Sequence, residues 1–280
     1  MSGDRQHYLP AALLGGFGER TRNRGLREAR LLARRRASGK VDGGVCKAAN
    51  EAFEIGMYRL AAPPAGVDRD VIDRLWDPVE SQLPDLIRRL ETKKLESGDD
   101  VLLLNYVSMA AVRHPIFEAV ATDWARRNGY KPALGDQVQM LRAVALKNQI
   151  AASSKWRWRV VHVPADIPRL TITDRGWMMI GEPDRSDCSL LVSMSPRVAL
   201  LGYLDAPDLP PARPPFEEHL DLCLSWVEWV RAAMWDDPTI NAVYTHPSDR
   251  SWLEAIPDHR TLRVSEFGPF RMRKSSGLMD

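Results

Sequence analysis

The amino-acid sequence predicts an α+β protein in which a helical block packs on a mostly antiparallel sheet. Between residues 68 and 152, apolar side chains recur every three or four positions, which is the period of a helix. Between residues 155 and 204 the period shortens to two, which is the period of a strand. Helices and strands are thus segregated along the chain, as is typical of the α+β class. A chain of 280 residues can bury a sizeable core, and we expect a single domain over 1–280.

The first sixty residues are expected to form an N-terminal segment followed by a basic hairpin. From Glu19 to Lys40, nine basic side chains face two glutamates, and nine minus two leaves a charge of +7. The residues by themselves fit a helix, because helix formers are common there, or two strands joined by a turn, because glycines punctuate the stretch. A basic surface of this kind attracts polyanions through counterion release. The alternative is a solvated arginine-rich face.

The helical block spans 68–152. In its first part, Pro78 and Pro84 interrupt the apolar stripe, so we expect a kinked helix or two pieces. The second part, 101–127, begins apolar on nearly every side, which is typical of a buried helix, and Pro115 should bend it. A further helix is expected over 133–153.

The sheet block with its helix spans 155–250. Alternating aromatic and β-branched residues predict a strand in 155–164, and shorter strand patterns follow to residue 204. A proline-rich break follows. Helical spacing of apolar residues then predicts a helix over 217–235, and a closing strand is expected over 241–246. A basic tail at 260–280 ends the sequence.

Composition restricts the class of protein without identifying a partner. The net charge is +2, and no apolar run reaches the roughly 20 residues that a membrane helix requires. The first residues lack the pattern of a signal peptide, so the cytoplasm is the expected compartment. Three cysteines without CxxC spacing favour buried thiols over a disulfide framework or a zinc site.

Candidate functional residues must be chosen by their neighbours, because the sequence contains no Walker loop, GxSxG or HExxH motif. His7 lies in QHYLP, where a proline stiffens the backbone beside a side chain that can move protons. Arg113 and His114 lie at the predicted helix bend in an apolar segment. A buried guanidinium needs an anion or a solvent-lined pocket, and pairing with Glu80 or Asp174 is the structural alternative to ligand binding.

Two further candidates lie in the sheet block. Asp174 ends a strand pattern, where binding sites are commonly built, although an aspartate there can simply open a turn. Trp158 alternates with basic residues in KWRWR, so its ring is a candidate for stacking on a nucleic-acid base, with core packing as the alternative.

Several short motifs follow one another in a recognisable order. They are His7-Tyr8-Leu9-Pro10, Val79-Glu80-Ser81, Arg113-His114-Pro115, Thr171-Ile172-Thr173-Asp174 and Ser193-Met194-Ser195-Pro196. Over about residues 6–250, this order resembles a bacterial family known as domain of unknown function 4238. The resemblance implies no activity. It does imply that the basic stretch is a strand hairpin and that His7, Glu80, Arg113 and Asp174 form one set, with His7 reaching the Asp174 end of the sheet.

The sequence leaves two functions open, and with them the question of whether the protein is an enzyme. In the first, it binds nucleic acid, another polyanion or a partner protein, and the binding residues are Arg113, His114, Arg34, Arg35, Arg36 and Trp158. In the second, it is a nuclease-like phosphoesterase that depends on a metal or on acid–base chemistry. His7 would then move protons, Glu80 and Asp174 would hold a divalent cation or orient water, and Arg113 would hold the anion. An open cavity shared by these four residues favours the enzyme, whereas a closed network favours a scaffold.

Overall fold

The computed structural model describes most of the chain between its two ends. It covers residues 5–256 except 21, 23, 39, 42–43, 155, 181–188, 205–215, 217 and 238, and it describes only the backbone at 204, 218 and 236. Three sequence expectations lie outside the described residues, namely the basic tail at 260–280, the proline-rich break at 210–215 and the burial of Cys188.

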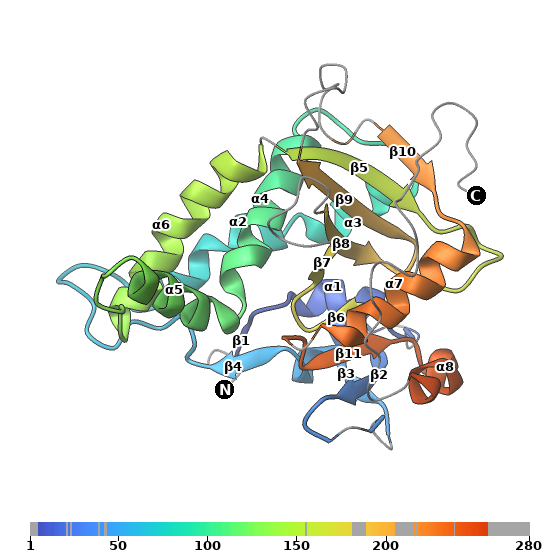
Figure 1. Cartoon of the computed structure of the whole chain (residues 1–280), viewed down its shortest axis with the longest axis horizontal. Helices are drawn as coiled ribbons and strands as arrows, with labels where there is room; N and C mark the ends of the chain where they lie inside the picture. Colours follow the sequence, from blue (N-terminus) through green and yellow to red (C-terminus); the bar gives the residue numbers. More distant parts are fainter. Residues whose placement is uncertain are drawn as a thin grey trace.

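The helical block divides where its prolines predict (Figure 1). Its elements are η3 (Asp73–Leu75), α2 (Asp77–Glu80), α3 (Leu83–Glu91), α4 (Asp99–Arg113), α5 (Ile116–Arg127) and α6 (Asp136–Ser153). Pro78 and Pro84 each occupy the first turn of a helix, where a missing N–H is tolerated, so the stripe forms two pieces. Pro115 separates α4 from α5, because the residue before a proline avoids the helical conformation and His114 is extended.

The sheet block contains a five-stranded sheet. Its strands are β5 (Trp156–His162), β7 (Trp177–Ile180), β8 (Ser189–Ser195), β9 (Val198–Leu204) and β10 (Glu218–Asp221), in the spatial order β10-β5-β9-β8-β7. Every neighbouring pair is antiparallel except β10 and β5, which are parallel. The indole N–H of Trp177 donates to the carbonyl oxygen of Ala110 in α4 at 3.3 Å, which ties the sheet to the helical block. The predicted α+β class is therefore confirmed.

A second, four-stranded sheet joins strands from the early and the late parts of the sequence. Its strands are β2 (Arg30–Arg35), β3 (Cys46–Lys47), β6 (Ile172–Thr173) and β11 (Ala242–Thr245), in the order β3-β2-β11-β6. The antiparallel pairing of β2 with β3 confirms the basic hairpin. On its other side β2 pairs with β11, although about two hundred residues separate the two strands in sequence. The strand that precedes Asp174 thus belongs to this sheet rather than to the five-stranded one.

The helix predicted over 217–235 is wrong in its first third. Residues Glu218–Asp221 form β10, and the helix α7 begins only at Leu224 and ends at Asp236. The leucines at 220, 222 and 224 alternate with polar or small residues, which is the period of a strand, and the same leucines also fit a helical stripe. Pairing with β5 decides between the two, because β10 shares its backbone hydrogen bonds with that strand.

The N-terminal segment is ordered and packed, as expected. It contains β1 (Arg5–His7), α1 (Ala11–Gly16), η1 (Leu26–Glu28), η2 (Ala48–Asn50) and β4 (Phe53–Ile55), and β1 pairs antiparallel with β4. The apolar side chains Leu13, Leu14 and Phe17 are almost completely buried, so the segment docks on the core. The described chain closes with η4 (Pro247–Asp249) and α8 (Arg250–Ala255). Within the described residues, no helix has the length and apolar character needed to cross a membrane.

Candidate functional site

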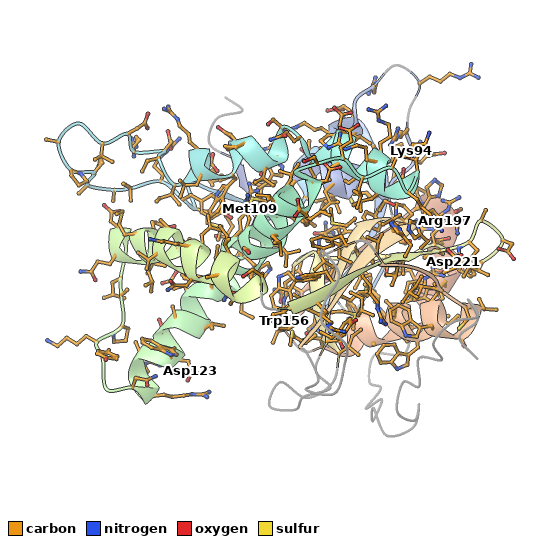
Figure 2. All side chains as sticks on the ribbon, turned by 90° about the horizontal axis from the view of Figure 1, so that it is seen from above. Lys94, Met109, Asp123, Trp156, Arg197 and Asp221 are labelled. Atoms are coloured by element: carbon orange, nitrogen blue, oxygen red, sulfur yellow. The ribbon has the colours of Figure 1, made fainter. Side chains whose placement is uncertain are left out.

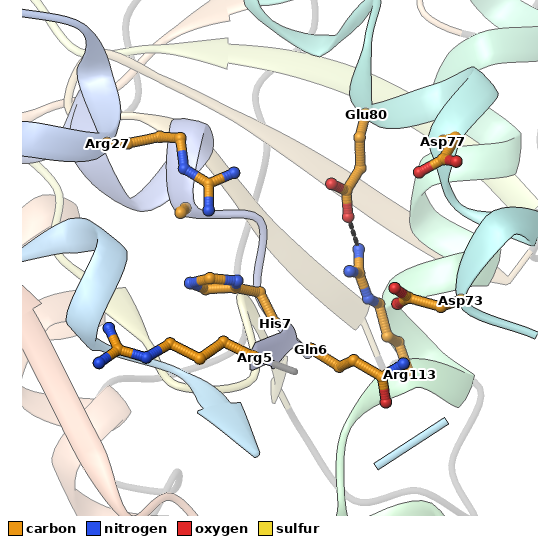
Figure 3. Close-up of a pocket in the computed structure, with 9 residues that line it drawn as sticks. Arg5, Gln6, His7, Arg27, Asp73, Asp77, Glu80 and Arg113 are labelled. Atoms are coloured by element: carbon orange, nitrogen blue, oxygen red, sulfur yellow. Dashed lines mark hydrogen bonds and ion pairs between the residues drawn. The ribbon is translucent and has the colours of Figure 1, made fainter. Parts of the chain in front are cut away.

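The N-terminal segment separates two cavities. We call the first the His7 cavity, and its volume is about 460 Å³. It is lined by Arg5, Gln6, His7, Ala11, Arg27, Asp73, Asp77, Glu80 and Arg113. Figure 3 shows Arg5, His7 and Arg27 on one side and the three carboxylates on the other, with Arg113 between them. Three of the four residues that the sequence grouped together, His7, Glu80 and Arg113, therefore meet in one cavity.

His7 is held in a defined orientation in the wall of the His7 cavity. It lies opposite Phe53 in the β1–β4 pair, and the two ring centroids are 5.7 Å apart. Its Nε2 lies 3.3 Å from the carbonyl oxygen of Ala49. Since a carbonyl oxygen can only accept, Nε2 carries the proton of the neutral ring and Nδ1 is left as the basic nitrogen.

The surroundings of His7 keep its imidazole neutral. Burial, together with the nearby guanidinium groups of Arg27, Arg113 and Arg5, lowers the pKa of His7 to about 4, although the hydrogen bond to Ala49 opposes the shift. At pH 7 the side chain is therefore a proton acceptor. A bound anion would offset the positive charges around it and raise this pKa.

The opposite wall is acidic because η3 and α2 present carboxylates at Asp73, Asp77 and Glu80. Burial raises the pKa of Asp73, and the neighbouring carboxylates Glu80 and Asp77 raise it too, whereas Arg113 opposes the shift. The cavity therefore holds two titratable groups whose pKa values move in opposite directions from their ordinary values. This arrangement is common where one group accepts a proton and another donates one.

Arg113 and Glu80 form a buried ion pair, which is one of the two pairings that the sequence allowed. The guanidinium donates to a carboxylate oxygen of Glu80 and lies 5.8 Å and 5.6 Å from the ring centroids of Tyr58 and Trp76. The side chain of Arg113 is only 4% exposed, whereas that of Glu80 is 30% exposed. Glu80 is thus committed to neutralising Arg113.

Asp174 does not join this group. It lines a second cavity of about 440 Å³, which we call the Asp174 cavity, and its carboxylate lies 3.6 Å from Nε2 of His114. The prediction that His7 reaches the Asp174 end of the sheet is therefore wrong. Tyr8 lies there instead, in an edge-on contact with His114 in which the two ring centroids are 5.0 Å apart. Successive side chains of an extended segment point to opposite sides, so His7 and Tyr8 enter different cavities.

The three consecutive arginines of the hairpin are bound within the protein. Arg34 is buried, donates to the carbonyl oxygens of Leu253 and Ile256, and lies over the ring of Trp235. Arg35 pairs with Glu51, and Arg36 donates to carbonyl oxygens around the end of α7. Arg34 and Arg36 thus fasten β2 to the C-terminal elements, and the three arginines do not form the open basic face that the sequence suggested.

Trp158 packs in the core rather than at a surface. Its indole N–H donates to the carbonyl oxygen of Ser153 at 3.0 Å, and its ring stacks between Trp156 and Phe216. Gly202 on the adjacent strand leaves the space for this ring. The alternative interpretation, core packing, is therefore the one that the structure supports.

Several cavity residues were missed by sequence reasoning. Arg5, Arg27, Asp73 and Asp77 stand in segments that carry many charged residues, so their type and spacing do not distinguish them. The only available signal was Pro78 at the start of α2, which fixes the short helix that presents two of the carboxylates. In the part of the chain that the structure describes, no three acidic, histidine or cysteine side chains gather closely enough to hold a metal ion.

Comparison with family models agrees with the order of motifs. The model described as "Protein of unknown function (DUF4238)" matches residues 5–221. The chain belongs to this family. The matched region of this DUF4238 protein includes every residue that lines the His7 cavity, and it stops before β11, which completes the Asp174 cavity. Comparisons with curated proteins and with solved structures gave no match.

Proposed function

We propose that the protein is an acid–base phosphoesterase whose site is the His7 cavity. The observation that carries the proposal is the juxtaposition, in one solvent-open cavity, of a neutral histidine, a carboxyl group of raised pKa and exposed arginines. The volume of about 460 Å³ suits a small phosphoester or the end of a larger one.

The cavity has the donors that an anionic group requires. Arg5 and Arg27 are both exposed, and Arg5 is oriented by a hydrogen bond to the side chain of Asn50 at 2.7 Å and by the face of Phe53. In addition, the side-chain nitrogens Nε2 of Gln6 and Nε of Arg113 are buried with no hydrogen-bond partner among the described residues. Guanidinium groups match the geometry of phosphate oxygens well.

The roles of the ionisable groups follow from their environments. His7 is the general base because Nδ1 is unprotonated at pH 7, and Asp73 is the general acid because its pKa is raised. Glu80 holds Arg113 and is not available for proton transfer. Asp174 lies in the other cavity, so Glu80 and Asp174 do not form the joint cation site that the sequence suggested.

The proposed step is a direct displacement at phosphorus. A water oxygen attacks the phosphorus atom while Nδ1 of His7 takes a proton from that water. The bond from phosphorus to the leaving oxygen breaks, and Asp73 donates its proton to that oxygen. The products are an alcohol and a phosphate, and the proton on His7 returns to Asp73 through solvent. Arg5 and Arg27 stabilise the charge on the phosphoryl oxygens.

Binding of nucleic acid or another polyanion stays a prediction. With Arg34, Arg35 and Arg36 engaged inside the protein, its support comes from the exposed side chains of Arg24, Arg27 and Arg30 near η1. An oligonucleotide is therefore included among the substrates of the test.

Hydrolysis of p-nitrophenyl phosphate, bis(p-nitrophenyl) phosphate and a short oligonucleotide in the presence of EDTA tests the proposal. We expect turnover of at least one substrate, and His7→Gln should lower kcat by about 100-fold or more, the usual contribution of a general base. Activity should increase as pH rises through about 4, where His7 loses its proton, and decrease once Asp73 ionises, so the optimum is acidic.

Arg24→Gln is the matched control for Arg27→Gln. Both arginines are exposed and close in sequence, but only Arg27 lines the cavity, so only Arg27→Gln should raise KM. Thermal melts of each variant show whether it is folded. The proposal fails if folded His7→Gln retains full activity, if EDTA abolishes turnover, or if the unsubstituted protein hydrolyses none of the three substrates.

A further inference from the structure

The Asp174 cavity has a chemistry of its own, beyond the proposed phosphoesterase site. Its volume is about 440 Å³, and the wall that separates it from the His7 cavity is the N-terminal segment. The lining residues are Tyr8, Arg35, Ala37, Asn50, Glu51, Ala52, Phe53, Asp174, Asn241, Ala242 and Tyr244.

The cavity is rich in groups that accept hydrogen bonds. The carboxylate of Asp174 is almost fully buried, and within the described part of the chain it accepts only long hydrogen bonds, of 3.3 and 3.2 Å, from the backbone N–H of Asn241. Tyr8 and Tyr244, whose hydroxyls can accept or donate hydrogen bonds, line the same cavity. A buried carboxylate is normally well hydrogen-bonded, so the two long contacts of Asp174 leave it able to accept from a stronger donor.

The charge balance of the lining is negative. Glu51 is paired with Arg35, which leaves Asp174 as the second carboxylate. Nδ1 of His114 accepts a hydrogen bond from the backbone N–H of Ile116 at 3.1 Å, and its Nε2 lies 3.6 Å from the carboxylate of Asp174. At 3.6 Å the imidazole does not make a hydrogen bond that would satisfy the buried carboxylate.

Aromatic rings complete the site. Tyr8, Phe53 and Tyr244 line the same cavity, and the faces of such rings attract cations. We propose that the Asp174 cavity binds an organic cation, a primary ammonium group attached to an apolar or aromatic body. The ammonium would donate to Asp174 and to the tyrosine hydroxyls, and its body would lie against the rings.

Isothermal titration of the full chain with benzylamine and with benzyl alcohol tests this proposal, since the two probes have nearly the same shape. We expect saturable binding of benzylamine, at least tenfold tighter than that of benzyl alcohol. Asp174→Asn should weaken benzylamine binding at least tenfold, and Tyr244→Phe should weaken it by a smaller factor. His7→Gln, in the other cavity, should leave it unchanged.

Glu54→Gln is the control for general charge effects, because Glu54 is an exposed carboxylate beside this cavity that does not line it. If Asp174→Asn does not fold, Tyr244→Phe decides, because it removes one hydroxyl and conserves the ring. Equal affinity for the two probes, no binding of benzylamine, or unchanged binding in a folded variant of the cavity overturns the proposal.

A second inference comes from the surface of α5 and α6. Figure 2 shows α5, which carries Asp123, projecting away from the sheet. Large apolar side chains on α5, on α6 and on the loop between them are exposed. They are Val120, Trp124, Tyr130, Leu134, Met140, Leu141 and Val144. Trp124 and Tyr130 are 60% and 62% exposed and stack on each other with ring centroids 5.6 Å apart, and Leu134 is 71% exposed.

The size of this apolar face matches one side of a stable interface. If side chains of this size have roughly 150–250 Å² of surface each, the exposed fractions amount to on the order of 700 Å². That area exceeds the roughly 300–600 Å² of the largest patch on a typical monomer and is close to the ~800 Å² that each partner buries in a standard interface.

The pattern along α6 indicates what covers the face. Positions Gln137, Leu141, Val144, Asn148 and Ala151 are all exposed, and their spacing alternates between four and three residues. This is the spacing of a seam between two helices, and none of the five carries a charge. The exposed Lys147, three residues after Val144 and four before Ala151, lies at the side of this seam. We infer that a second copy of the chain packs on this face to form a symmetric dimer.

Size-exclusion chromatography with light scattering, from 1 to 100 μM protein, measures the oligomeric state. We expect a dimer of the full chain, and Trp124→Glu combined with Val144→Glu should convert it to a folded monomer. Ile55→Glu is the matched control, because Ile55 is 77% exposed but belongs to β4 rather than to α5, α6 or the loop between them. A monomer throughout this concentration range, or a dimer that survives the double substitution, overturns the inference.

Discussion

Replacing Gly15 with alanine should destabilise the protein by about 3 kcal/mol or more, which is at the upper end of the cost of overpacking. Gly15 lies in α1, and a Cβ built on it would stand 1.9 Å from the backbone carbonyl oxygen of Leu26. A backbone atom cannot rotate away as a side chain can. The helix α1 and η1 would therefore have to move apart. Ala11 of α1 and Arg27 of η1 both line the His7 cavity, so the wall of that cavity would be disrupted as well.

Gly16→Ala is the control, because the adjacent glycine has open space around the same position. It should be neutral or should stabilise the protein by up to about 1 kcal/mol through its helix propensity. Urea unfolding followed by circular dichroism measures both variants. Similar unfolding free energies for the two would show that α1 does not pack against η1 as described.

Glu80→Gln should cost about 3–5 kcal/mol of unfolding free energy, the usual effect of removing one partner from a buried ion pair. The cost arises at Arg113, whose guanidinium stays charged and buried when the opposing charge is lost. Arg113→Met should cost less, because the carboxylate of Glu80 is partly exposed and water can solvate it.

The double variant of Glu80→Gln and Arg113→Met distinguishes this explanation from a simple loss of packing. We expect it to be more stable than Glu80→Gln by itself, because no uncompensated buried charge remains. Denaturant unfolding of the four proteins of the cycle gives the coupling energy. Additive effects of the two substitutions would mean that the pair does not stabilise the fold through its charges.

The sequence predicted much of the fold because its local signals agreed with the tertiary structure. Pro78, Pro84 and Pro115 act through their own backbone geometry, so the helix breaks are local events. The alternation in β5 is likewise local. By contrast, the leucines at 220 and 222 fit both a helix and a strand, and only the neighbouring β5 makes the strand favourable.

Part of the candidate site was predictable, because local sequence signals pointed to some of its residues. His7, Glu80 and Arg113 were chosen by residue type and neighbours, and they do meet in one cavity. Asp174 was grouped with them and lies in the other cavity, because the direction in which a side chain leaves an extended segment depends on its pairing. Asp73 and Asp77 escaped notice because nothing local distinguishes a carboxylate in a cavity wall from one in solvent.

By itself, the sequence determined the α+β class, the division of the helical block and the need of Arg113 for an anionic partner. These follow from backbone sterics, hydrophobic period and the cost of burying a charge, all of which act within a short stretch of chain. Only the tertiary structure decided that β2 pairs with β11, that Arg34 and Arg36 bind carbonyl oxygens, and that His7 and Tyr8 face different cavities. Those contacts join residues far apart in the chain, so their energies depend on which partners the whole fold brings within reach.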